Sequence, residues 1–261
     1  MVNISAVEPV KLTLKSKFSF RCHKDISCFT KCCSNIDIML TPYDIVVLKK
    51  RFGMTSYEFL EKYTYTDVEQ KSSHPFVYLR MKDDEAKNCP FVTQEGCSIY
   101  EDRPANCRYY PVGQGTLKKE VADKIVDEEF YFLVKEEHCK GFEEPDEWTI
   151  ERWREDQGVD RYDELNREWK SILLRKNLPG QELDEKKQAM FYMSCYDLDR
   201  FRSFIFDSRF LDVFQIDDPA RGKMREDDTA LMLFGFKFLK YMLMMEETLK
   251  PRPKGQGEGQ T

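Results

Sequence analysis

The sequence is poor in histidine and in unbroken apolar stretches, and both shortages limit what the chain can do. It has three histidines in 261 residues. Two of these, His23 and His138, adjoin cysteines, so no Ser/His/Asp catalytic arrangement is evident. The most apolar stretch, residues 230–245, contains Lys237 and Lys240 and falls short of the roughly 20 residues that a membrane span needs. We therefore expect no membrane partner.

The sequence also lacks a signal-peptide core, an excess of positive charge and a nucleotide-binding loop. Lysines interrupt the first 21 residues, which predicts a cytoplasmic protein. The formal net charge is −6, and this balance argues against nucleic acid as a partner because the phosphate backbone attracts basic surfaces. The segment Gly113-Gln114-Gly115 lacks the strand–turn–helix context of a Gly-rich nucleotide loop.

Cysteine, by contrast, is abundant and clustered, with nine in the chain. The first window holds Cys22, Cys28, Cys32 and Cys33, the second holds Cys89, Cys97 and Cys107, and Cys139 follows His138. A reducing cytoplasm disfavours structural disulfides, so thiols at this density predict bound metal. The rival interpretation, a secreted protein with four disulfides and one free thiol, is less favoured. Cys195 lies in a helical region and is predicted to be a small buried hydrophobic residue.

The eight clustered thiols form the pool from which metal ligands are drawn. Four thiolates make a tetrahedral zinc site or hold an iron–sulfur cluster, and the chain has neither paired C-x2–4-C knuckles nor a C-x2-C-x2-C ferredoxin run. The side chains of adjacent Cys32 and Cys33 are expected to point apart. They would then serve two sites, or one would ligate while the other is packed or redox-active. Eight thiols suffice for one four-thiolate site with spares or for two sites.

Two arginines flank Cys107 in the second window. Arg103 and Arg108 either offset the negative charge of a thiolate-bound centre and hydrogen-bond to sulfur, or form ordinary salt bridges with nearby carboxylates. His23 and His138 are weaker ligand candidates than the cysteines, and a surface or capping role is favoured for both.

Local patterns predict an α+β protein with an irregular, cysteine-rich first part that contains short helices and strands. Thr41-Pro42 is a helix start, with Thr41 as the cap and Gly53 as the end. Thr55-x-x-Glu58 is a capping box for a second helix. Residues 12–20, 76–81 and 130–134 are predicted strands.

Beyond this part the pattern becomes helical. A helix is predicted to begin at 145–147 and to end at 179–180, a second to span 183–214 with a break near 207–208, and a last one to span 229–249. The predicted domains are therefore a cysteine-cluster metal-binding domain over 1–144, a helical region over 145–250 and a disordered tail over 251–261.

The second window resembles the signature of the CxxCxxCC family, which is described as zinc- or iron-chelating. Its members carry an upstream cluster that ends in Cys-Cys, then Leu-Thr-x-x-Asp, Cys-Pro-Phe, Gly-Cys-x-Ile-Tyr, Arg-Pro and Cys-Arg-x-Tyr-Pro. Here Cys32-Cys33, 40–44 and 89–111 supply these pieces in order. The resemblance covers roughly residues 20–142, and the upstream spacing departs from the family pattern. That departure leaves open which of Cys22 and Cys28 is a ligand.

The resemblance implies a metal centre and gives little information on activity. A related group, the flagellin lysine N-methylases, is associated with a [4Fe–4S] cluster, and by this analogy iron–sulfur is favoured over zinc. The function predicted first is an iron–sulfur protein that is redox-active or supports protein modification, with an unidentified protein or redox partner. The alternatives are a zinc protein in which the metal organises the fold and an S-adenosylmethionine-dependent protein lysine methylase. The residues alone do not decide whether the chain is an enzyme.

Overall fold

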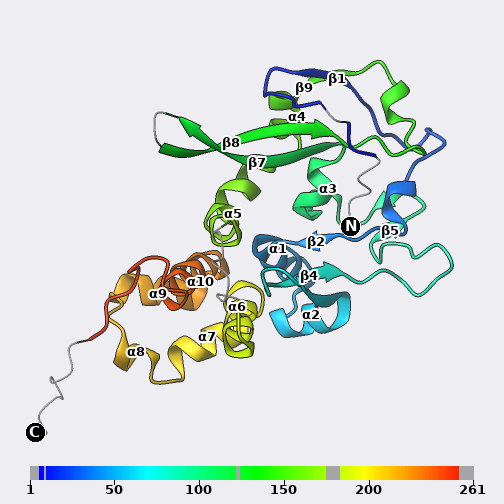
Figure 1. The fold of residues 1–261 in the computed structure, drawn as a ribbon. Helices are drawn as coiled ribbons and strands as arrows, with labels where there is room; N and C mark the ends of the chain where they lie inside the picture. The colour runs from blue at the N-terminus through cyan, green and yellow to red at the C-terminus, as the bar shows by residue number, and fades with distance from the viewer. Residues whose placement is uncertain (1–5, 9, 122–123, 175–182, 253–261) are drawn as a thin grey trace, which may run out of the picture. The chain divides into compact units, whose positions relative to one another are not determined.

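The computed structural model describes residues 6–8, 10–121, 124–174 and 183–252, and its elements confirm the α+β prediction. Short strands dominate the first part and helices the second (Figure 1). The chain divides into two compact units, each made of two segments. Unit 1 comprises Met1–Leu40 and Tyr78–Glu164, and unit 2 comprises Thr41–Val77 and Leu165–Thr261. The predicted boundary at residue 144 stays a prediction, and the predicted disordered tail falls largely on residues 253–261, outside the described residues.

Unit 1 is built from strand pairs and short helices. Its strands include β1 (Lys17–Ser19), β2 (Met39–Leu40), β5 (Val92–Thr93), β6 (Gly96–Cys97), β7 (Val112–Val121), β8 (Lys124–Leu133) and β9 (Glu147–Thr149). Its helices include α3 (Ala105–Tyr109) and α4 (Ile150–Asp156). Strands β7 and β8 form the long antiparallel hairpin of Figure 1, in register from Val112 opposite Leu133. The predicted strand at 130–134 is therefore confirmed, as the end of a longer β8.

The core of unit 1 is formed by residues from both of its sequence segments. Strand β1 pairs antiparallel with β9, so that Phe18 lies opposite Trp148. Phe20 packs edge-to-face on Trp153, with ring centroids 5.5 Å apart. The rest of this cluster comes from the hairpin and α4, namely Val112, Tyr131, Leu133 and Ile150. Burial of these side chains closes unit 1 around residues that lie more than a hundred positions apart.

Unit 2 is helical. It contains α1 (Pro42–Phe52), α2 (Ser56–Tyr63), β3 (Thr64–Val68), α6 (Glu185–Cys195), α7 (Leu198–Phe206), α8 (Phe210–Val213), α9 (Asp218–Glu226) and α10 (Asp228–Met242). Strand β4 (Pro75–Leu79) and helix α5 (Val159–Leu173) run across the division between the units. Both predicted helix starts are confirmed, because Thr41 and Thr55 each form a full capping box. Gly53 ends α1 in the left-handed conformation.

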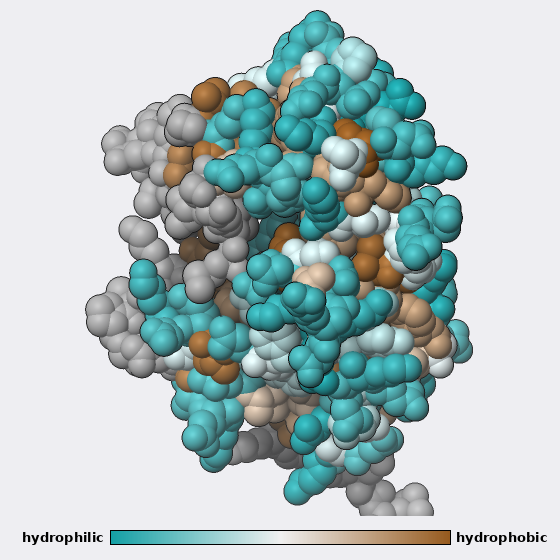
Figure 2. All heavy atoms as spheres, turned by 90° about the vertical axis from the view of Figure 1, so that its right-hand side faces the viewer, coloured by the Kyte–Doolittle hydropathy of each residue, from teal (hydrophilic) through white to brown (hydrophobic). Residues whose placement is uncertain are grey.

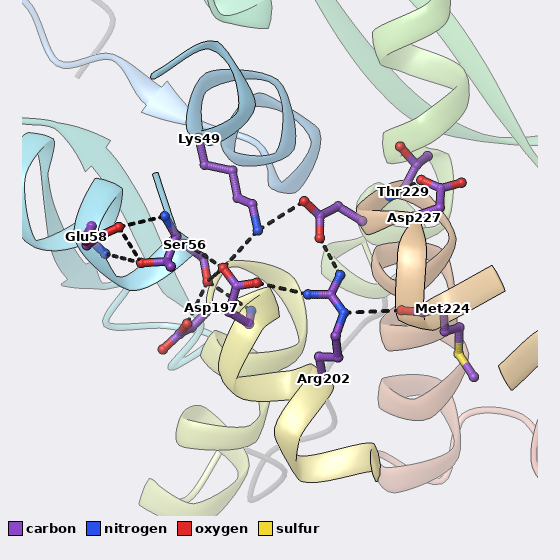
Figure 3. A network of polar contacts seen from close by, with 11 residues as sticks. Lys49, Ser56, Glu58, Asp197, Arg202, Met224, Asp227 and Thr229 are labelled. Atoms are coloured by element: carbon purple, nitrogen blue, oxygen red, sulfur yellow. Dashed lines mark hydrogen bonds and ion pairs between the residues drawn. The ribbon is translucent and has the colours of Figure 1, made fainter. Parts of the chain in front are cut away.

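A buried polar network ties the helices of unit 2 together (Figure 3). The Lys49 ammonium on α1 pairs with Asp199 at 2.8 Å and with Asp228 at 3.0 Å. Arg202 on α7 pairs with the same two carboxylates. The Ser56 amide and hydroxyl also donate to Asp199, at 2.6 and 3.0 Å. Every charge in this group therefore has an opposite charge beside it, which burial requires.

Three sequence predictions for the helical region were wrong or incomplete. Residues 147–149 form strand β9 rather than the start of a helix, because the segment pairs with β1 and the Thr149 hydroxyl then caps α4. The stretch 183–214 breaks at Tyr196-Asp197 as well as at 207–209, giving α6, α7 and α8. The last helix ends at Met242 instead of 249. The predicted helix end at 179–180 lies outside the described residues.

The surface shown in Figure 2 is mostly hydrophilic, with hydrophobic residues in small separate groups. Exposed large hydrophobic residues are scattered along the chain, from Val10 to Met244, as is usual for globular proteins. In the described part of the chain, the helices are too short or too polar to cross a lipid bilayer.

Candidate metal centre

The eight clustered cysteines all lie in unit 1, and Cys195 lies in unit 2. Cys195 is fully buried in α6, and burial raises its pKa well above the usual value. This is the environment of a packing residue, as predicted. Among the eight, Cys28 and Cys89 are buried, Cys22 is exposed, and the others are half-buried.

The first cysteine window is a chain of tight turns. Backbone N–H groups of Ile26, Phe29, Lys31 and Cys33 each donate to the carbonyl three residues earlier. Thr30 takes a left-handed φ of 64° just before the short 3-10 helix Lys31–Cys33. This coiling brings four thiols that are spread over twelve residues into one small region, which fits the predicted loop around a metal.

Cys139 is held against this first window by backbone contacts. The Arg21 amide donates to the Gly141 carbonyl at 3.0 Å, and the Lys140 amide donates to the Cys28 sulfur at 3.1 Å. Gly141 permits the approach, because a Cβ there would lie 2.6 Å from the Phe20 ring and 3.0 Å from the Arg21 carbonyl oxygen. The predicted late ligand therefore lies beside the predicted early ones.

The second window meets the end of the first window. The Cys89 amide donates to the Cys33 carbonyl at 2.7 Å, and Ser34 forms a β-bridge with Asn88. Strands β5 and β6 then form a small hairpin in which Cys97 lies opposite Val92. Cys107 lies on α3, where the Asn106 side chain donates to the Met39 carbonyl at 3.0 Å. Cys89 and Cys107 therefore lie near Cys33, and Cys97 lies near Cys89.

Arg103 and Arg108 hold the loops of the second window. The Arg103 guanidinium donates to the Tyr100 carbonyl and to the Gln157 side chain. Arg108 donates to the carbonyls of Glu101, Arg103 and Gln157. The partners seen here are neither sulfur atoms nor the carboxylates of the predicted salt bridges. Both arginines therefore position the loop, and burial lowers the pKa of Arg103 while the nearby Cys107 thiol opposes that shift.

The thiols alter one another's pKa. Although Cys22 as a residue is exposed, partial burial of its thiol raises the pKa to about 11, and the charges of Cys32, Cys28 and Cys139 add to the effect. Burial likewise raises the pKa of Cys139 and of Cys89. A hydrogen bond with the Cys32 thiol raises the pKa of Cys33 and lowers that of Cys32. The two thiols therefore lie close enough to interact, contrary to the expectation that they point apart.

Tyr110 supplies a donor that the sequence analysis missed. Its hydroxyl is buried and makes no hydrogen bond of ordinary geometry, but the Cys139 thiol lies close enough to interact with it. After burial, the Cys139 thiol is the main cause of its raised pKa, so the two groups are neighbours. A metal-bound thiolate would accept a hydrogen bond from such a hydroxyl. The only sequence signal was the position of Tyr110 in the Cys-Arg-x-Tyr-Pro segment.

The donor set fits a thiolate-bound metal, although the side chains are not yet arranged around one point. Within the described residues, no three Cys, His, Asp or Glu side chains are placed to hold an ion as they stand. The gathered donors are thiols, which suit zinc and iron–sulfur centres. His23 lies near the carboxylates of Asp25 and Glu144, at 3.8 and 3.6 Å, and His74 packs on Phe191 in unit 2.

Comparison with known proteins supports a metal centre. Residues 21–144 match the model of the CxxCxxCC family, described as "Putative zinc- or iron-chelating domain". Searches of curated proteins and of solved structures gave no match. The matched segment contains all eight clustered cysteines, which confirms the resemblance drawn from the sequence. Residues 21–144, a little under half of the chain, are therefore similar to the CxxCxxCC domain.

Proposed function

We propose that this domain binds an iron–sulfur cluster of the [4Fe–4S] type through its cysteines, and that the cluster is redox-active or supports modification of a partner protein. The observation that carries the proposal is the gathering of eight thiols from three distant segments into unit 1, with the buried Tyr110 hydroxyl beside Cys139. Eight thiols are enough to supply the four thiolates that a cubane cluster needs.

Two features support iron–sulfur in particular. The Lys140 amide already donates to the Cys28 sulfur, and hydrogen bonds to sulfur are one means by which proteins set the reduction potential of a cluster. The resemblance to the cysteine-cluster proteins of the flagellin lysine N-methylase type points the same way. When bound, the cluster would supply one-electron chemistry, and this chain's residues would hold it and limit its access to water.

A zinc-binding structural role is the second candidate. Unit 1 has short strands, short helices and the consecutive turns of 22–33, and a structural metal stabilises such irregular folds. In that case the metal would organise the fold, and the activity would belong to other surfaces of the chain.

The test is metal analysis of full-length protein purified without oxygen. Iron, sulfide and zinc are quantified on one sample whose visible absorption spectrum is also recorded. Equal amounts of iron and sulfide, at about four of each per chain for every cluster bound, with a broad charge-transfer absorption, would support the proposal. A colourless protein that contains zinc alone would replace it with the structural role. A protein that binds neither metal after reconstitution would contradict both.

A further inference from the structure

The contacts of the eight thiols suggest two groups of four, which meet at the adjacent residues Cys32 and Cys33. The Cys139 set consists of Cys22, Cys28, Cys32 and Cys139, and the Cys89 set consists of Cys33, Cys89, Cys97 and Cys107. We propose that the domain holds two metal centres, one on each set, and that the division falls between the adjacent residues Cys32 and Cys33. This inference rests on the proposed function, since it concerns how the same thiols share their metals.

Backbone contacts define the Cys139 set. The Arg21–Gly141 hydrogen bond places Cys22 beside the segment that carries Cys139. The Lys140 amide then bonds to the sulfur of Cys28 itself. Cys22 and Cys139 have the same two thiols as neighbours, those of Cys28 and Cys32. These contacts therefore gather four thiols from two segments into one region.

Different contacts define the Cys89 set. The hydrogen bond from the Cys89 amide to the Cys33 carbonyl joins the two windows. Cys33 has Cys89 and Cys107 as neighbouring thiols, and Cys89 has Cys97. The β5–β6 hairpin is also fixed to the first window, because the Gly96 Cα lies close to the Phe29 ring, where an added Cβ would be 3.1 Å from Cζ.

The number of ligands argues against one shared centre. A single zinc ion or cubane cluster uses four thiolates, so one centre would leave four thiols gathered without a metal. Each set has the four that a complete centre needs. The contact between the Cys32 and Cys33 thiols places the two centres next to each other.

The decisive experiment uses the full-length, metal-loaded wild-type protein. Metal is removed in steps with a chelator, exposed thiols are alkylated at each step, and mass spectrometry identifies the modified cysteines. We expect the thiols of one set to become reactive together while the four thiols of the other set stay protected. Simultaneous exposure of all eight, or a protected group that mixes members of the two sets, would overturn the proposal.

Matched serine variants provide a second measurement. Cys139→Ser and Cys97→Ser each remove one ligand from a different set, and Cys195→Ser is the control because that thiol is buried in unit 2. Each single variant should retain about half of the wild-type metal, the double variant almost none, and the control all of it. Total loss of metal in either folded single variant, or no loss in one of them, would indicate one centre. Absence of metal from the wild type would instead contradict the proposed function itself.

Discussion

The two units of the molecule reach stability by different means. Most of the largest fully buried side chains among the described residues belong to unit 2, including Trp169, Tyr196, Phe191 and Phe201. Unit 1 has a smaller aromatic core around Phe20 and Trp153, and its cysteine loops are joined by turns and single hydrogen bonds. A helical unit can therefore depend on packing alone, whereas a loop-rich unit of this kind has fewer buried contacts and would gain more from the cross-links that a bound metal supplies.

Metal removal should separate the two units most clearly. In zinc-finger peptides a structural zinc contributes about 10–16 kcal/mol to the folded state, so chelation should loosen unit 1 strongly and leave unit 2 folded. Hydrogen exchange followed by mass spectrometry would check this. Peptides from 22–33, 89–107 and 139–144 should lose protection, while those from α6 and α10 keep it. Equal protection in unit 1 before and after chelation would show that the metal does not stabilise the fold.

Breaking the charge network should affect unit 2 alone. Asp199→Ala leaves the Lys49 ammonium, whose side chain is only 8% exposed, with Asp228 as its remaining partner. We expect a loss of about 2 kcal/mol in the free energy of unfolding, because the hydrogen bonds to Asp199 are lost while Lys49 keeps one opposite charge. Denaturant unfolding measures it, with the exposed Asp218→Ala, whose side chain is 91% exposed, as control. The control should change stability by less than about 0.5 kcal/mol, and metal content should be unchanged in both.

Two helical glycines offer a matched test of packing in unit 2. A Cβ at Gly235 on α10 would lie 2.4 Å from the Ser194 carbonyl oxygen, which is backbone and cannot move aside easily. Gly235→Ala should therefore destabilise the protein by about 2 kcal/mol. A Cβ at Gly222 on α9 meets nothing within 4 Å, so Gly222→Ala should stabilise it by about 0.5–1 kcal/mol. Thermal unfolding of both variants gives the signs, and identical shifts would contradict close packing of α6 on α10.

The smallest expected effect is a dependence of unit 2 on pH. Burial lowers the pKa of His74, whose Nδ1 has no hydrogen-bond partner. As the pH falls below about 6.5, the unfolded chain binds a proton that the folded state resists. The free energy of unfolding should therefore decrease as the pH falls, and His74→Leu should flatten that decrease. Denaturant titrations from pH 7.5 to about pH 5 would measure it; the same slope in both proteins would assign it to other groups.

Local signals predicted much of the fold, and long-range pairing accounts for what they missed. The capping boxes at Thr41 and Thr55 were readable because the residues that form them lie within four positions. The pairing of β1 with β9 could not be predicted from local signals, because Lys17 and Glu147 are 130 residues apart. Residues 147–149 were read as helix for this reason, because nothing near Trp148 in the sequence reveals its contact with Phe18.

For the candidate site, too, the sequence predicted one part and missed another. The cysteine spacing identified eight candidates and a family, and it left open how the thiols are shared. Their grouping depends on tertiary contacts, such as the Arg21–Gly141 and Cys33–Cys89 hydrogen bonds. Tyr110 was missed because a tyrosine in a loop is usually packing, and only the structure places its buried hydroxyl beside the Cys139 thiol.

Cys139 is synthesised long after its neighbour Cys28, and this order has a consequence for biosynthesis. A ribosome adds roughly 5–20 residues per second, and Cys139 follows Cys33 by more than a hundred residues. The thiols of 22–33 thus exist for roughly 5–20 s before their last neighbour has been made. During that interval they are a partial chelator, open to oxidants and to competing metals. All eight thiols are available to a metal only after residue 139 has been made. A nascent chain that stops before it can offer only Cys89, Cys97 and Cys107 in addition to the thiols of 22–33.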